Sequence, residues 1–338
     1  MIVVLDSNVW LSELGLRSGA AAAVRFFLNQ SNAQVAVPEV VQLEVRHNLT
    51  NRLSTHAKEI RDNYRQLLTA FGKLREIVLP TEEEIQAKVE ELFASLGVQQ
   101  QQIPFSLESA RSALFKAIQK APPCDKSQEF KDAVIWADCV ALLATDEVVL
   151  VTNDKAFYRD RAYEKGLAPN LHDEAKHLPH PIRILPSLSD LLEVIQAPIP
   201  LEQELLQEAI FEAFGESING TLARTGFSLG ARQDVTYKLF ATENPSELFL
   251  EFSIAIACSD SREEGRTNAL LSLNGDGLYS PTNRTFANLR NFGEHLAWLN
   301  ANGEPQETRN HYLYANGIVI GHREVTYDVR HALPANER

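Results

Sequence analysis

Continuous apolar runs alternate with helix-like segments along the first part of this chain of 338 residues. Three of these runs cover residues 2–5, 35–37 and 148–151, and a fourth strand-like run covers residues 182–185. A strand that is apolar at every position is typical of a parallel sheet buried on both faces, whereas a strand with one solvated face alternates. The pattern therefore predicts an α/β fold, with a parallel sheet sandwiched by helices, over residues 1–198.

The segments between these runs carry local signals of helices. Thr81, followed three residues later by Glu84, forms a capping box that predicts the start of a helix. The strongly apolar stretch 127–144 predicts a helix in the core. Other expectations are a polar helix over residues 55–75, a surface loop at Gln99–Gln102 and a helix over residues 155–165.

A change in the sequence pattern near Ala197–Pro200, from alternating strands and helices to mainly strand-like runs, marks the expected boundary between two domains. Two prolines that flank one residue favour an extended connector. Beyond it, a helix over residues 201–214 precedes several strand-like runs, so residues 199–338 are expected to form a smaller β-rich (α+β) domain. Asn316-Gly317 predicts a hairpin turn, and Asn274–Gly277 a second turn.

Composition narrows the class of protein. The chain is 44% hydrophobic and 23% charged, which is typical of a globular protein. It contains no apolar run long enough for a membrane helix and no signal peptide at its start, so we expect a cytoplasmic protein with no membrane partner. Its three cysteines, Cys124, Cys139 and Cys258, form no paired motif, which argues against a disulfide framework or a zinc site.

The formal net charge of −13 argues against broad, nonspecific adhesion to nucleic acid, which usually requires a basic face. A local site is still compatible with this charge. A cluster of carboxylates that holds a metal ion is itself acidic, and the ion then supplies the positive charge that meets a phosphate.

Four acidic residues occupy positions that suggest such a cluster. Asp6 follows the first strand and Asp154 follows the strand at residues 148–151, and ligands of parallel sheets bind beyond the carboxyl ends of the strands. Glu44 lies in the helix expected after Pro38, and Asp132 lies near the start of the apolar helix. A buried carboxylate needs a cation or a proton to balance it. The four positions together predict a divalent-metal site.

The motifs around these residues resemble those of the PIN-domain nuclease family. They are Val3-Val-Leu-Asp-Ser-Asn8, Glu44 early in its helix, Lys131-Asp-Ala-Val-Ile-Trp136, and Val149-Leu-Val-Thr-Asn-Asp-Lys-Ala-Phe157. The resemblance covers residues 1–195 and not the remainder. It implies a cluster of acidic residues at the carboxyl edge of a parallel sheet that binds one or two Mg(II) or Mn(II) ions.

The resemblance also implies a role for each residue. The expected catalytic residues, which bind the metal or hold metal-bound water, are Asp6, Glu44, Asp132 and Asp154. The residues expected to orient these carboxylates or water by hydrogen bonds are Ser7, Asn8, Thr152 and Asn153. The resemblance further implies a hydrolase in which the metal lowers the pKa of a water that attacks the phosphodiester in line. By the same resemblance, the products would carry 5′-phosphate and 3′-hydroxyl ends.

Two other acidic residues, Asp138 and Asp146, compete for the role given to Asp132. Asp138 lies about 240° round a helix from Asp132, so the two cannot face one cleft equally. We prefer Asp132, because the Asp-Ala-x-Ile sequence that begins there matches the pattern of the family resembled.

Several functional alternatives remain open at this point. Most of the family resembled acts on RNA, so the expected partner is a nucleic-acid substrate, single-stranded RNA in preference to DNA. The alternatives are a noncatalytic PIN-like scaffold that binds RNA or a protein partner, and the toxin of a toxin–antitoxin pair. The domain at residues 199–338 could bind substrate, sense a signal, or hold a homodimer or a protein partner; its acidic balance makes unaided binding of nucleic acid the weakest of these.

Overall fold

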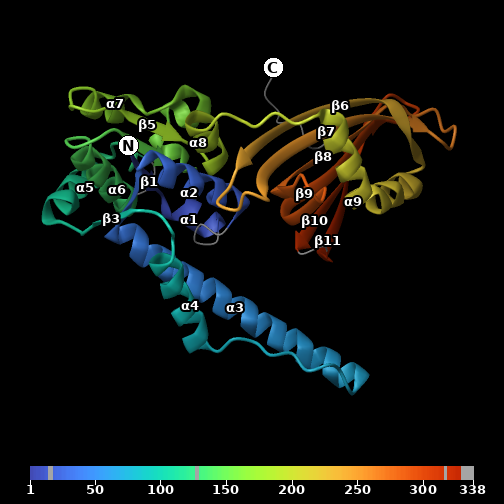
Figure 1. The fold of residues 1–338 in the computed structure, drawn as a ribbon, viewed down its shortest axis with the longest axis horizontal. Helices are drawn as coiled ribbons and strands as arrows, with labels where there is room; N and C mark the ends of the chain where they lie inside the picture. The colour runs from blue at the N-terminus through green and yellow to red at the C-terminus, as the bar shows by residue number, and fades with distance from the viewer. Residues whose placement is uncertain (14–17, 126–128, 316–317, 329–338) are drawn as a thin grey trace. The chain divides into compact units, whose positions relative to one another are not determined.

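The computed structural model describes residues 1–13, 18–125, 129–315 and 318–328 (Figure 1). The chain divides into two compact units, Met1–Arg17 with Val24–Ile195 and Ser18–Ala23 with Gln196–Arg338. The first contains a parallel sheet flanked by helices and the second an antiparallel sheet. The predicted fold class is therefore confirmed, while the domain boundary between residues 198 and 199 stays a prediction.

The sheet of the first unit has five parallel strands in the order β3-β2-β1-β4-β5. The strands are β1 (Ile2–Leu5), β2 (Gln34–Pro38), β3 (Gln100–Ile103), β4 (Val148–Val151) and β5 (Ile182–Leu185). Every residue of β1 and β4 is buried, as their continuous apolar sequences require. Because Leu5 pairs with Val151, the chain leaves both central strands at the same edge of the sheet.

Eight α-helices lie in the described residues before residue 196. They are α1 (Ser7–Ser12), α2 (Gly19–Ser31), α3 (Glu39–Phe71), α4 (Glu82–Ala94), α5 (Leu107–Gln119), α6 (Phe130–Leu142), α7 (Pro169–Ala175) and α8 (Leu188–Ile195). The capping box of Thr81 and Glu84 is present at the start of α4, with both of its hydrogen bonds. The buried helix predicted at 127–144 is α6.

Three local expectations were wrong. The polar segment 55–75 is no separate helix, because its residues up to Phe71 are the continuation of α3, which runs without a break from Glu39. Gln99–Gln102 is no loop: its last three residues begin β3, an edge strand whose open side accommodates polar side chains. Residues 155–165 form three short 3₁₀ turns, η1 (Lys155–Phe157), η2 (Arg159–Arg161) and η3 (Tyr163–Lys165), because Asp160 and Arg161 adopt positive φ angles that interrupt an α-helix.

Helix α3 is unusual for its length of 33 residues, which corresponds to about 50 Å. Its first part packs against α4, where Arg46 forms an ion pair with Glu90 and lies over the ring of Phe93. Its distal part projects away from the sheet, and the following chain returns beside it (Figure 1). We call residues 52–80, the distal part of α3 with this returning segment, the arm.

The second unit combines one long helix with a six-stranded antiparallel sheet in the order β11-β10-β9-β8-β7-β6. Its elements are α9 (Gln203–Thr225), β6 (Phe227–Ala241), β7 (Leu248–Asp260), β8 (Thr267–Ser280), β9 (Thr285–Leu299), β10 (Pro305–Ala315) and β11 (Ile318–Asp328). Leu206, Ile210 and Ile218 of α9 belong to the same apolar core as Leu250 and Leu271 of the sheet. Burial of this shared core holds the helix against the strands.

The sequence placed two features of this unit incorrectly. The helix predicted to end at Phe214 continues to Thr225, where Gly226 adopts a left-handed conformation. Asn274–Gly277 is no turn, because it lies within β8, with Asn274 paired to Ser253 and Gly293 in the flanking strands. The turn predicted at Asn316-Gly317 lies outside the described residues, between the antiparallel strands β10 and β11.

The burial of β4 predicts how the first unit responds to a cavity. Leu150 is fully buried at the centre of the sheet, so Leu150→Ala is expected to lower the free energy of unfolding by about 2–5 kcal/mol. The matched control is Leu107→Ala, which removes the same atoms from an exposed side chain and should change this free energy by less than about 0.5 kcal/mol. Urea denaturation followed by circular dichroism measures both, and equal effects would contradict the fold.

Candidate functional site

Asp6 occupies the point where the central strand β1 ends. Its backbone N–H donates to the carbonyl of Val151 (3.0 Å), which ties it to the neighbouring strand. Its buried carboxylate accepts hydrogen bonds from the Thr152 hydroxyl (2.8 Å), the Ser7 hydroxyl (3.2 Å) and the Asn8 amide (3.5 Å). Burial raises the pKa of Asp6 despite these hydrogen bonds, and the charge of Asp154 raises it further.

Asp154 is held at the corresponding position after β4. Its carboxylate accepts from the N–H of Ala156 (2.7 Å), and its own N–H donates to the Thr152 hydroxyl (3.1 Å). Because that hydroxyl also donates to the Asp6 carboxylate, the buried Thr152 connects the Asp6 side chain with the backbone of Asp154. Asn153 is exposed. Among the described residues, its one hydrogen bond is made by its backbone carbonyl, which accepts from the Tyr163 hydroxyl.

Asp132 reaches the same place from the first turn of α6. Its carboxyl group is hydrogen bonded to that of Asp154, and the pKa of Asp132 is raised to about 8. Burial is the main cause, followed by the negative charges of Asp6 and Asp154. Two carboxyl groups in contact do not both ionise easily, so a shared proton or a cation must balance them.

Glu44, in the second turn of α3, joins this group through Ser7. The Ser7 hydroxyl bridges the two acids, because it lies 3.1 Å from the Glu44 carboxylate and 3.2 Å from that of Asp6. The other Glu44 oxygen accepts from the ammonium group of Lys131. The structure thus places all four predicted acidic residues in one hydrogen-bonded and electrostatically coupled network, which we call the carboxylate cluster.

The donor atoms of the carboxylate cluster fit a hard divalent cation such as Mg(II) or Mn(II), which prefers carboxylate oxygen. Burial, and after it the charges of the neighbouring acids, raise the pKa values of Asp6 and Asp132, and a bound cation would favour their ionised forms. No set of three or more His, Cys, Asp or Glu side chains in the described part of the chain is already arranged to hold a metal ion. Binding would therefore require a rotation of these side chains.

The competing acids have other partners. The Asp138 carboxylate accepts from the Ser109 hydroxyl of α5 (2.7 Å), and burial raises the pKa of Asp138 to about 6. Asp146 binds the N-terminal ammonium of Met1 (2.6 Å), a hydrogen bond that lowers its pKa. Neither residue has a contact with the carboxylate cluster among the bonds described, in agreement with the helical offset between Asp132 and Asp138.

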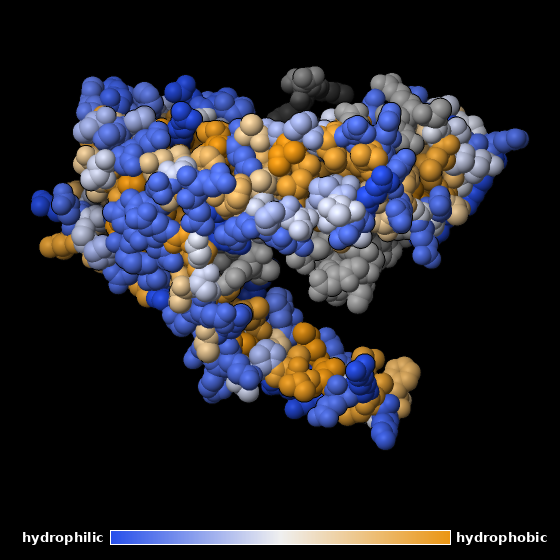
Figure 2. Space-filling model, in the orientation of Figure 1, coloured by the Kyte–Doolittle hydropathy of each residue, from blue (hydrophilic) through white to orange (hydrophobic). Residues whose placement is uncertain are grey.

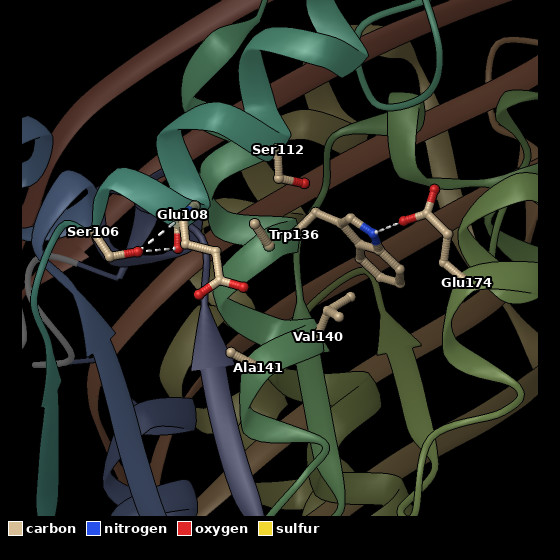
Figure 3. Close-up of a pocket in the computed structure, with 9 residues that line it drawn as sticks. Ser106, Glu108, Ser112, Trp136, Val140, Ala141 and Glu174 are labelled. Carbon is tan, nitrogen blue, oxygen red and sulfur yellow. Dashed lines mark hydrogen bonds between the residues drawn. The ribbon is translucent and has the colours of Figure 1, made fainter.

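A separate hollow of about 240 Å³ lies over α5 and α6 (Figure 3). The indole N–H of Trp136 points across it and donates to Glu174 (2.8 Å), whose other oxygen is paired with Lys116. The hollow contains none of the four acids of the carboxylate cluster. We therefore assign it no part in their chemistry.

Sequence reasoning missed two contacts at the carboxylate cluster. The first is the ion pair of Lys131, which is adjacent to Asp132 in the sequence, with Glu44 of another helix. The second is the hydroxyl of Thr152, which connects Asp6 with Asp154. The signal for Lys131 is helix geometry, since adjacent residues lie about 100° apart and face different neighbours.

The raised pKa of Asp132 predicts how stability depends on pH when no metal ion is present. A carboxyl group with a raised folded-state pKa contributes stability that is complete below its unfolded value of 3.8 and is lost as the pH rises through about 8. In the presence of a chelator at about pH 8, the melting temperature of Asp132→Asn should therefore exceed that of the wild type by about 2–4 °C or more. At about pH 4 the difference should be smaller. The control is the exposed Asp62→Asn, and parallel profiles for all three proteins would contradict the argument.

The comparisons with known proteins agree with this geometry. No curated protein and no solved structure matches the chain, and no family model matches its C-terminal part. No described helix is both long and apolar enough to span a bilayer. Residues 3–157 match the sequence model of the PIN domain, and this range contains the whole carboxylate cluster. The N-terminal part of the chain is therefore a PIN domain, a fold of the nuclease type.

Proposed function

We propose that the PIN domain is a divalent-metal-dependent phosphodiesterase that hydrolyses RNA. The observation that supports this most is the meeting of Asp6, Asp132 and Asp154 from two strand ends and a helix start. A structural role for one buried and two half-buried acids that repel one another is costly, and a cation that they bind would relieve the repulsion.

The residues around the acids would hold them in position. Thr152 and Ser7 direct hydroxyl groups at Asp6, and the N–H of Ala156 fixes Asp154. Lys131 balances part of the charge of Glu44. Glu44 would therefore approach an ion only after its ion pair with Lys131 rearranges. Such supporting contacts set the orientation of the metal ligands. Their loss commonly lowers activity about 10- to 100-fold.

The bound Mg(II) or Mn(II), one ion or two, would lower the pKa of a water and neutralise the scissile phosphate. The carboxylates would bind and orient that water for in-line attack. The products would carry 5′-phosphate and 3′-hydroxyl ends. Single-stranded RNA is the proposed substrate because the family to which these motifs belong acts mostly on RNA.

The first test is cleavage of labelled single-stranded RNA and DNA by the full chain with Mn(II) or Mg(II). We expect metal-dependent cleavage of RNA that falls by at least about 1,000-fold in Asp6→Asn and Asp154→Asn, because each change removes a charged ligand of the ion. Asp138→Asn is the matched control, since it makes the same change at a buried acid outside the cluster and should keep its activity.

The outcomes of this experiment separate the competing functions. Equal loss in Asp138→Asn would point to unfolding instead of chemistry. Wild-type protein that binds RNA without cleaving it under any metal condition would replace the enzyme with a noncatalytic scaffold.

A second test concerns Thr152, which bridges Asp6 and Asp154. Thr152→Val keeps the shape of the side chain and removes the hydroxyl, so kcat is expected to fall roughly 10- to 100-fold with little change in KM. Thr152→Ser retains the hydroxyl and should recover most of the activity. Steady-state kinetics on the best RNA substrate measures both variants, and equal loss in both would indicate a packing role instead.

A further inference from the structure

The arm exposes large apolar side chains far from the carboxylate cluster. The exposed fractions are 48% for Ile60, 51% for Leu67, 72% for Phe71 and 92% for Val78, and Leu68 and Ile77 are exposed as well. Figure 2 shows these hydrophobic residues as orange groups on the part of the molecule that projects outward. A concentration of apolar surface of this kind is typical of an interaction site, in contrast to the single exposed hydrophobic residues that most proteins tolerate.

The spacing of the apolar residues in the arm is that of a coiled coil. They follow one another at intervals of four and three residues: Leu53, Ala57, Ile60, Tyr64, Leu67 and Phe71. Part of this seam is already covered, since Ala57 is buried and the Tyr64 hydroxyl donates to the carbonyl of Arg75 in the returning segment (2.7 Å). Ile60, Leu67 and Phe71 form the open side and lie within about 20° of one direction round the helix. A second helix is the structure that packs against such a stripe.

The charges of the arm lie away from this stripe. Measured from Ile60, Arg61, Arg65 and Lys58 lie about 100°, 140° and 160° round the helix. Over residues 56–71, the flank at about −40° to −80° contains His56, Asn63 and Ala70 and no Lys, Arg, Asp or Glu, while Arg52, at the base of the arm, lies at about −80° as well. A membrane-binding helix has cations beside its apolar stripe, and an RNA-binding helix presents them as its contact face. A neutral flank instead suits a partner with the same flank, because no like charges meet.

We propose that the arm pairs with the arm of a second copy of this chain. A two-fold axis that crosses the helix between Asn63 and Tyr64 places Ile60 of one copy opposite Leu67 of the other, and the reverse, as an isologous interface requires. The two α3 helices then run antiparallel, with the uncharged flanks against each other. The returning segment of each arm adds two further exposed apolar side chains, Ile77 and Val78.

The pairing is tested first by the mass of the full chain in solution, measured by light scattering and sedimentation across a range of concentrations. Leu67→Glu would bury an unpaired charge and should raise the dissociation constant of the dimer by roughly 100-fold. Thr69→Glu is the matched control, because Thr69 is exposed about 180° from the stripe and its substitution should leave the dimer intact. Circular dichroism establishes that both variants fold.

A cross-linking experiment tests the orientation. Oxidised Asn63→Cys should form a covalent dimer, since the two copies of residue 63 lie beside the axis. The two copies of His56→Cys are about 22 Å apart in an antiparallel pair and should not cross-link, whereas a parallel pair would join both. A wild-type chain that stays monomeric at every concentration, or a monomer that binds anionic lipid vesicles or RNA through Leu67, would overturn the proposal.

Discussion

The parallel pairing of β1 with β4 is the constraint on which the rest of the PIN domain depends. It joins two segments almost 150 residues apart. Because the two strands are parallel, both end at the same edge of the sheet, so Asp6 and Asp154 become neighbours. The strands are buried throughout, and a shift of register by one residue would not change which faces are apolar. The hydrogen bond from Asp6 to Val151 and the Thr152 bridge therefore do much to fix the relative height of the two carboxylates.

The acids of the carboxylate cluster repel one another, and the stability of the surrounding fold holds them together. Desolvation and mutual charge both disfavour ionisation of Asp6 and Asp132, while hydroxyl and amide donors partly offset this cost. A protein can retain such a site when its binding partner carries the opposite charge. In the proposed enzyme, the same acids that make the free domain less stable would supply the binding energy for a cation. The ion pair of Glu44 with Lys131 shows how the chain balances one of them internally.

The sequence predicted those parts of the fold in which one local signal agrees with tertiary burial. Continuous apolar runs located β1, β2 and β4, and Asp6 and Asp154 directly follow β1 and β4 in the structure. The prediction failed where burial was incomplete, at the glutamine-rich edge strand β3, or where backbone conformation decided the outcome, at Asp160 and Arg161. Contacts such as that between Lys131 and Glu44 join distant helices, so no local pattern encodes them.

Helix α3 contributes Glu44 near its beginning and the apolar stripe near its end. The distance from Glu44 to Phe71 along the helix is about 40 Å. The start of the helix therefore lies in the carboxylate cluster, and its end lies far from it. A tilt of about 5° at Glu44 would displace the far end by about 3–4 Å, since displacement grows in proportion to helix length. Conversely, whatever holds the far end limits the angles that the Glu44 backbone can adopt. The stiffness of the helix would in this way connect the proposed pairing of the arms with the geometry of the carboxylate cluster.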